Sequence, residues 1–315
     1  LLAASFLSAT ILPGGSEALL WGFLRLHPGE QWTALALATL GNTAGGMTSW
    51  WCGRVLPKWQ RLENIPHKDK VERWGSPVLL LHGLGSSTRD WEHQKAALAA
   101  RHKIILMDLR GHGRSDRPNE QYSIAGFAED VLALLDHLQL EQVHLVGISM
   151  GGMTAFQLAV EHPQRLLSLS IVNSSPEVRM HNLKSALQIS QRWLFSQLMS
   201  MDAIGKMVSQ KLFPKPEQAA LREKTVERWR FNDKRAYLAS LNAIIGWSVR
   251  DKLGLITCPT LVITADQDYT PVAEKQAYVN ELPNAKLLVI ADSHHATPID
   301  QAQHFIQALL EFLDN

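Results

Sequence analysis

Short apolar runs alternate with longer stretches of helical periodicity from residue 77 to the end of the chain. The runs are five or six residues long and rich in Leu, Ile and Val, as strands buried in a parallel sheet are. Between the second and third runs, apolar side chains recur every three or four residues over 127–138, as on one helix face. This alternation predicts an α/β fold in which helices cover both faces of a mostly parallel sheet. The predicted strands are Pro77–Leu81, Lys103–Asp108, Val143–Ile148, Leu167–Val172, Pro259–Thr264 and Lys286–Ile290.

The strand pattern is interrupted between residues 176 and 254, where helical stretches rich in Met, Trp and Leu replace it. We therefore predict an α/β core, residues 77–175 and 255–315, with a helical insertion at 176–254. The Met and aromatic side chains of the insertion are expected to form its own core, and adaptable ligand contacts are the alternative.

Residues 1–76 differ in composition from the rest of the chain. Residues 1–56 hold four charged side chains, whereas 57–73 hold eight. Thr33–Gly53 runs 21 residues without a charge, enough for a helix to cross a hydrocarbon layer of about 30 Å. A secretory signal is disfavoured, because no basic region precedes Leu1–Leu12. Residues 1–76 are therefore predicted to be an apolar, membrane-type helical segment, with membrane association through residues 1–56.

Charge and cysteine content exclude several classes of function. With 31 Lys and Arg against 30 Asp and Glu, the net charge of +1 does not suit a nucleic-acid partner. Cys52 and Cys258 are far apart and show no zinc-type spacing, so we predict reduced thiols, no metal and no cofactor. The basic residues that follow the apolar segment predict that the α/β part faces the cytoplasm, tethered to the inner membrane.

A G-x-S-x-G motif, Gly147-Ile148-Ser149-Met150-Gly151, joins a predicted strand to a predicted helix at 150–161. A serine hydroxyl becomes a useful nucleophile when a tight strand-to-helix turn exposes it and holds it against a base. Ser149 is therefore the candidate nucleophile. The Met150 N–H, at the helix start, is a candidate oxyanion donor. Glycines that merely form a tight turn are the structural alternative.

The loop His82-Gly83-Leu84-Gly85 follows the first predicted strand and is expected to supply the second oxyanion donor, the Leu84 N–H. A Gly-rich loop after a strand also suits phosphate binding. The Lys and Ser/Thr ending of a P-loop and a G-x-G-x-x-G motif are both absent, which disfavours that function.

Candidate acids and bases follow the two last predicted strands. Asp266 and Asp268 come directly after one strand, and His294 and His295 come after the next. Both positions lie at strand carboxyl ends, where open α/β sheets bind ligands, and they keep the chain order Ser, acid, His. The residues themselves leave the choice within each pair open.

Residues 77–315 resemble the α/β-hydrolase superfamily, in particular its bacterial esterase, lactonase and carbon–carbon hydrolase branch. The resemblance implies an α/β-hydrolase fold with 176–254 as a helical cap, Asp268 as the acid, Asp266 shaping the turn, and His295 as the base. Ala265 stands where the family usually has glycine. The resemblance is carried by Leu81-His82-Gly83-Leu84-Gly85, the run from Asp108 to Asp116, the Ser149 turn, Asp266-Gln267-Asp268, and the run from Asp292 to Pro298.

The expected function is that of a carboxylesterase-like serine hydrolase, which cleaves a small-molecule ester or lactone through Ser149, His295 and Asp268 and an acyl-enzyme. Carbon–carbon hydrolysis, enol-lactone opening and perhydrolysis on the same triad are the alternatives. Haloalkane dehalogenation is disfavoured, because it needs a carboxylate where Ser149 stands. The charged run from Asp108 to Asp116 is interpreted as structural rather than as an anion site.

The first 77 residues resemble the N-terminal part of DedA-like (VTT, SNARE-associated) bacterial membrane proteins. Members of that family continue into further membrane segments, whereas relatives of the α/β part carry one or two more strands before His82-Gly83. We therefore predict a chimera of the two, with a natural membrane-tethered hydrolase as the first alternative and a catalytically inert, membrane-associated chimera as the second. The segments that carry this resemblance are 4–10, 13–17, 41–46 and 72–77.

Overall fold

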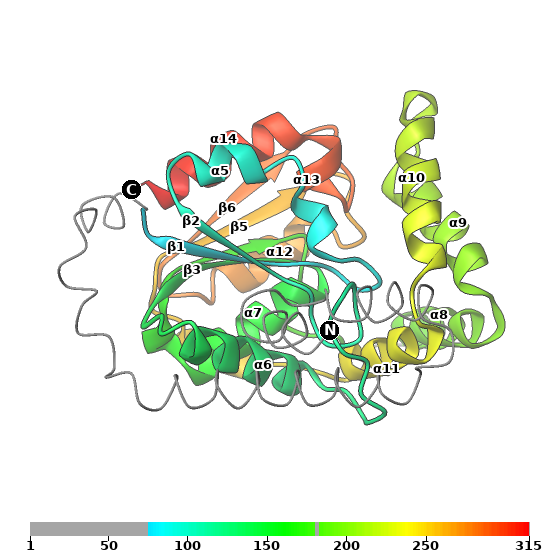
Figure 1. The fold of residues 1–315 in the computed structure, drawn as a ribbon, viewed down its shortest axis with the longest axis horizontal. Coiled ribbons are helices and arrows are strands. Elements are labelled where there is room, and N and C mark those ends of the chain that lie inside the picture. Colours follow the sequence, from blue (N-terminus) through cyan, green and yellow to red (C-terminus); the bar gives the residue numbers. More distant parts are fainter. Residues whose placement is uncertain (1–74, 180–182, 315) are drawn as a thin grey trace, which may run out of the picture. The chain divides into compact units, whose positions relative to one another are not determined.

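The computed structural model describes residues 75–179 and 183–314. In this part of the chain six strands form one sheet in the order β2-β1-β3-β4-β5-β6, and every neighbouring pair is parallel (Figure 1). Each strand predicted from the sequence is present, with its ends within one residue of the prediction. The strands are β1 (Pro77–Leu81), β2 (Lys103–Met107), β3 (Val143–Ile148), β4 (Leu166–Val172), β5 (Thr260–Ala265) and β6 (Ala285–Ile290).

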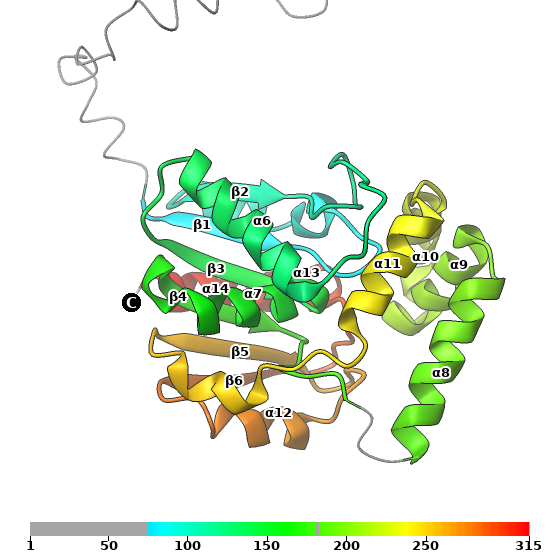
Figure 2. The ribbon, with the colours of Figure 1, turned by 90° about the horizontal axis from the view of Figure 1, so that it is seen from below.

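Helices cover both faces of this sheet (Figures 1 and 2). One face carries α6 (Ile124–His137), α7 (Met150–Glu161) and α12 (Val272–Val279), and the other carries α5 (Lys95–Ala99) and α14 (Ala302–Leu313). Alternate side chains of β1 enter the two resulting cores, because successive residues of a strand point to opposite faces. The central strands are mostly apolar for this reason, with polar exceptions such as His144 of β3 and Ser170 of β4.

Four helices stand between β4 and β5, at the end of the sheet toward which the strands run (Figure 2). A small apolar cluster of Met201, Ile204, Trp229 and Tyr237 holds part of this helical group together. We call this group the cap. Its helices are α8 (Leu183–Leu198), α9 (Met201–Leu212), α10 (Ala219–Arg230) and α11 (Lys234–Ile244).

Short helical turns connect the larger elements. The sequence pattern does not predict them, because one turn shows no periodicity. They are η2 (Thr88–Trp91), η3 (Pro163–Arg165), η4 (Pro216–Gln218), η5 (Arg250–Leu255) and the four-residue α13 (Thr297–Asp300).

The predicted membrane-type segment, Thr33–Gly53 included, lies outside the described residues. Among the helices of residues 75–179 and 183–314, none combines the length and hydropathy that crossing a membrane requires.

Candidate active site

Ser149 lies in the tight turn between β3 and α7. Its backbone angles, φ 54° and ψ −117°, fall in a region that non-glycine residues rarely adopt. The glycines are sterically required, because a Cβ at Gly151 would lie 2.4 Å from the Leu81 carbonyl oxygen. The Ser149 N–H donates to the Val172 carbonyl oxygen at 3.0 Å, which ties the turn to β4. The motif thus holds the serine in a strained turn at the carboxyl edge of the sheet.

The two candidate oxyanion donors lie beside this turn. Met150 is the first residue of α7, so its N–H is among those that a helix leaves without an internal acceptor. The loop with Leu84 is closed by a hydrogen bond from the Ser86 N–H to the Gly83 carbonyl oxygen, 3.2 Å long. A Cβ at Gly83 would lie 3.4 Å from the Ser149 Cβ, so this loop runs next to the serine.

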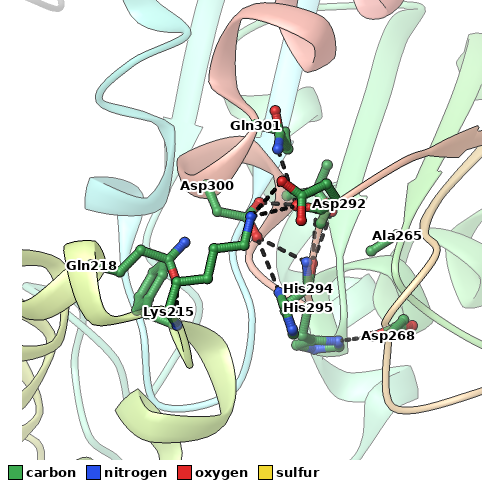
Figure 3. Close-up of polar contacts among 12 residues, drawn as sticks. Lys215, Gln218, Ala265, Asp268, Asp292, His294, His295, Asp300 and Gln301 are labelled. Carbon is green, nitrogen blue, oxygen red and sulfur yellow. Dashed lines mark hydrogen bonds and ion pairs between the residues drawn. The ribbon is translucent and has the colours of Figure 1, made fainter.

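The loops after β5 and β6 bring one acid and one histidine together. His295 Nδ1 lies 2.5 Å from Asp268 Oδ1 (Figure 3). The Asp268 side chain is 1% exposed and that of His295 is 14% exposed, so the acid is buried while the imidazole stays accessible. The Tyr269 ring stacks on the imidazole at 4.1 Å between centroids. This arrangement fixes the plane of the His295 ring.

The charge of Asp268 is maintained despite its burial. Burial by itself raises the pKa of this carboxyl group. The hydrogen bond and charge of His295, together with the charge of Lys275, outweigh burial and hold the pKa well below its ordinary value. An ionised Asp268 only accepts hydrogen bonds, so His295 Nδ1 carries the proton of the shared bond and Nε2 is the basic nitrogen.

The adjacent His294 is oriented differently. Its N–H donates to Asp300 Oδ2 at 2.8 Å, and its ring Nδ1 lies 3.9 Å from the same oxygen (Figure 3). Burial raises the pKa of Asp300, opposed by hydrogen bonds from His294 and Ser293. Of the two candidate histidines, the structure therefore places His295 against Asp268 and His294 against Asp300.

Of the two candidate acids, Asp266 joins the β5 and β6 loops. Its carboxylate accepts the backbone N–H groups of Asp292 and Ser293, each at 3.0 Å. This is the turn-shaping role that the sequence predicts for Asp266.

Two residues after β4 connect the turn of Ser149 to the histidine loop, and sequence reasoning missed both. The buried Asn173 donates from Nδ2 to the His295 carbonyl oxygen at 2.8 Å, and its Oδ1 accepts the Ala265 N–H at 2.8 Å. Ser174 Oγ donates to the Ser149 carbonyl oxygen at 2.7 Å. Polar residues directly after a buried strand were the available signal, as they were for the loops of β5 and β6.

The charged run from Asp108 to Asp116 forms a loop whose Asp108 and Arg110 side chains are paired within it or with neighbouring segments. The Asp108 carboxylate accepts the N–H groups of Thr88 at 2.7 Å and Arg114 at 3.1 Å. Gly113 has φ 52°, and a Cβ there would lie 2.3 Å from the Asp108 carboxyl carbon. Arg110 forms ion pairs with Glu120 and Asp130. The loop is therefore structural, as predicted.

The cap contacts the core on both sides of the candidate site. On one side Lys215 Nζ lies 2.5 Å from Asp292 Oδ2 in the histidine loop (Figure 3). On the other, Asn232 Nδ2 donates to the Gly85 carbonyl oxygen at 2.6 Å, and the Trp229 ring fills the space that a Cβ at Gly85 would need. Both loops of the site are thus linked to the cap.

Among the residues that the structure describes, no set of three or more His, Cys, Asp or Glu side chains is arranged around a common point that suits an ion.

Comparison with known proteins agrees with this architecture. Residues 76–302 match the family described as alpha/beta hydrolase fold. The chain is 32% identical over 252 residues to a putative carbamate hydrolase RutD of Variovorax paradoxus, covering 76% of this chain and 92% of that protein. It is 32% identical over 260 residues to a pimeloyl-[acyl-carrier protein] methyl ester esterase of Aeromonas hydrophila, covering 77% and 98%.

A third relative is the 3-oxoadipate enol-lactonase 1 of Acinetobacter baylyi, 28% identical over 238 residues and covering 75% of this chain and 88% of that protein. All three names describe hydrolytic enzymes. The chain belongs to the α/β-hydrolase family and is a hydrolase.

Proposed function

We propose that the chain is a serine hydrolase of carboxylic esters and lactones, with Ser149 as nucleophile, His295 as base and Asp268 as the acid. The observation that carries this proposal is the hydrogen bond between His295 Nδ1 and Asp268 Oδ1, at the sheet edge where the strained turn holds Ser149. A nucleophile, a base and a group that orients the base are the parts that acyl transfer requires.

The mechanism follows from the proton positions. His295 Nε2 takes the proton of Ser149 Oγ as the oxygen attacks the substrate carbonyl, and Asp268 stabilises the resulting imidazolium. The N–H groups of Met150 and Leu84 donate to the oxyanion. The imidazolium then protonates the leaving oxygen, which departs and leaves an acyl-enzyme. Water attacks the acyl-enzyme with His295 again as base, and free Ser149 is restored.

Enol-lactone opening is the second candidate function, favoured by the similarity to the enol-lactonase of Acinetobacter baylyi. A lactone is an ester whose leaving oxygen stays attached to the acyl group, so the same residues act in the same order. The carbamate hydrolase and methyl ester esterase relatives extend the panel of carbonyl substrates worth testing. Carbon–carbon hydrolysis and perhydrolysis are further alternatives on the same triad.

The decisive experiment is covalent labelling of the full chain with a fluorophosphonate probe. The wild type is compared with Ser149→Ala, His295→Ala and, as the matched control, His294→Ala. We expect labelling to disappear in the first two variants and to persist in the third. A folded wild type that takes up no label would overturn the proposal and favour the catalytically inert alternative.

A substrate panel then separates the candidate reactions. Rates are measured with a p-nitrophenyl acyl ester, an enol-lactone and an alkyl carbamate, with Ser149→Ala as the blank for each. Turnover of the ester at a higher kcat/KM than the other two would support the esterase function, and a preference for the enol-lactone would replace it with the second candidate.

Membrane association through residues 1–56 rests on composition alone, and we propose it on that basis. The test is fractionation of cells that express the full chain, with a carbonate wash of the membranes. Recovery of the labelled enzyme only in the supernatant would contradict the association.

A further inference from the structure

A buried lysine lies against the candidate acid. Lys275, on α12, is 1% exposed, and its Nζ donates to Asp268 Oδ2. Lysine is almost never fully buried unless its ammonium group is paired, because burying an unpaired charge is strongly unfavourable. The ammonium of Lys275 is therefore held at this position by the carboxylate of the acid itself.

The carboxylate of Asp268 consequently serves two basic groups. Its Oδ1 bonds to His295 at 2.5 Å, and its Oδ2 faces Lys275, with the Thr270 hydroxyl at 3.5 Å from the same oxygen. The carboxyl plane is thus fixed from both sides. The same arrangement places a positive charge opposite the imidazole, where it offsets part of the negative charge that His295 experiences.

We propose that Lys275 is a positioning residue of the reaction, which orients the Asp268 carboxylate and sets the pH at which His295 becomes a competent base. This inference rests on the proposed function of Ser149, His295 and Asp268. Lys275 itself is buried behind the acid and is not placed to contact a substrate.

Two effects of Lys275 have distinct kinetic signatures. Loss of its hydrogen bond frees the carboxylate to turn, which lowers kcat because the imidazole is less well oriented. Loss of its charge lets the full negative charge of Asp268 act on His295, so the imidazole holds its proton to higher pH. The acid side of the pH–rate profile then moves upward, because a protonated imidazole is not a base.

Other ionisable groups surround the pair and stay unchanged in the experiment. Burial lowers the pKa of Lys275, and the charges of Asp268 and Glu274 oppose that effect. Burial raises the pKa of Tyr278 and brings that of Tyr269 to about 12, so both phenols are neutral near pH 7. Arg192 of α8 and Tyr237 of α11 also act on Tyr269, and His294 and Asp300 lie in and beside the histidine loop.

Three substitutions separate orientation from charge. Lys275→Arg keeps the charge and the donors, Lys275→Gln keeps a donor without charge, and Lys275→Met removes both. Lys286→Met, on the exposed side of β6, is the matched control for loss of a lysine charge. For each full-length variant, kcat and KM on a p-nitrophenyl ester are measured from pH 5 to 9, and Tm is measured at pH 7.

We expect Lys275→Met to lower kcat by about tenfold with KM little changed, and to move the acid half-activity point up by about one pH unit. Lys275→Gln is expected to retain more of kcat but to show the same pH shift, whereas Lys275→Arg and Lys286→Met keep the wild-type profile. If Lys275→Met does not fold, Lys275→Gln carries the test.

A lower Tm with an unchanged pH profile and unchanged kcat in Lys275→Gln would overturn the proposal, because a purely structural ion pair affects stability alone. The labelling of the wild type by a fluorophosphonate separates this result from failure of the proposed function. If the wild type is labelled and active while the Lys275 variants keep its kcat and pH profile, only the role of Lys275 is rejected.

Discussion

The α/β core and the cap are stabilised in different ways. The core buries continuous apolar strands between two layers of helices. The cap, residues 183–244, in contrast holds 11 Lys and Arg against five Asp and Glu, and α8 leaves large apolar side chains exposed, Leu198 at 74%. The cap is joined to the core in part by polar contacts such as those of Lys224 and Arg228 with Glu92. The core is thus stabilised mainly by apolar burial, whereas polar contacts help to hold the cap against it.

The largest expected effect is on chemistry in the core. Ser149→Ala should lower kcat/KM by about 10⁴-fold or more, because the nucleophile is lost while the fold is kept. The rate of ester hydrolysis measures the loss of kcat/KM, and circular dichroism checks that the fold is kept. Residual activity above a tenth of the wild type would show that another residue performs the reaction.

Two leucines compare the effect on stability of a buried side chain in the core with that of an exposed side chain in the cap. Leu135 of α6 is 0% exposed, whereas Leu198 of α8 is 74% exposed. Leu135→Ala should lower the free energy of unfolding by about 2–5 kcal/mol, since it removes packed methyl groups and leaves a cavity. Leu198→Ala should change it by about 0.5 kcal/mol or less. Urea unfolding measures both, and equal losses would show that Leu198 of α8 packs as closely as Leu135 of α6.

Acid sensitivity is expected to arise in the core as well. Burial, with the charge of His102, lowers the pKa of His144 from 6.5 to about 4. Between pH 6.5 and about 4, this residue therefore binds a proton in the unfolded chain but not in the folded chain. The free energy of unfolding consequently falls as the pH drops through this range. His144→Asn should flatten this part of the profile by less than about 1.4 kcal/mol per pH unit, because solvent screens this partly buried ring. Urea midpoints at pH 7 and pH 4.5 test it, and an unchanged slope would refute it.

A smaller effect is expected where the cap meets the oxyanion loop. Asn232→Ala removes the hydrogen bond to the Gly85 carbonyl oxygen and should lower kcat by about tenfold, less than the 10²–10³ typical of losing an oxyanion donor itself. Asn242→Ala, which removes a bond to Trp193 inside the cap, is the matched control. Equal activity of the two variants would show that the cap does not position this loop.

The smallest effect concerns the ion pairs between cap and core. Lys215→Met removes the pair with Asp292 and should lower Tm only slightly, since the pair lies near the surface. The difference from wild type should shrink in 0.5 M salt, because screening weakens the pair in the wild type. Thermal unfolding at two salt concentrations measures it, and a salt-independent difference would point to packing instead.

Much of the core could be predicted from local pattern. All six strands are found within one residue of their predicted ends, because strands buried on both faces form short, mostly apolar runs. The G-x-S-x-G turn was recognisable because its glycines are required by contacts within a few residues and with the adjacent strand. The boundaries of the individual cap helices were not predicted from the sequence.

The site shows the limit of local pattern more clearly. Lys275 stands beside Glu274 and Gln276 in an ordinary helical sequence, and nothing there marks it as buried. Asn173 likewise looks like a loop residue in the sequence. In the structure its side chain hydrogen-bonds to the end of β5 and to the histidine loop, and so connects both to the end of β4. The contacts of Asn173 depend on partners that are distant in the sequence, and that of Lys275 depends on a loop conformation that the local sequence does not reveal.

The sequence by itself determined the strands, the serine turn and the short set of candidate acids and bases, because each depends on periodicity or on sterics between near neighbours. The choice of Asp268 and His295 within their pairs came from the family resemblance alone. The tertiary structure brings His295 to Asp268 and His294 to Asp300, and only the structure shows that Lys275 and Asn173 join them. These contacts are formed when parallel strands align their carboxyl ends, and that alignment is a property of the packed sheet rather than of any one segment.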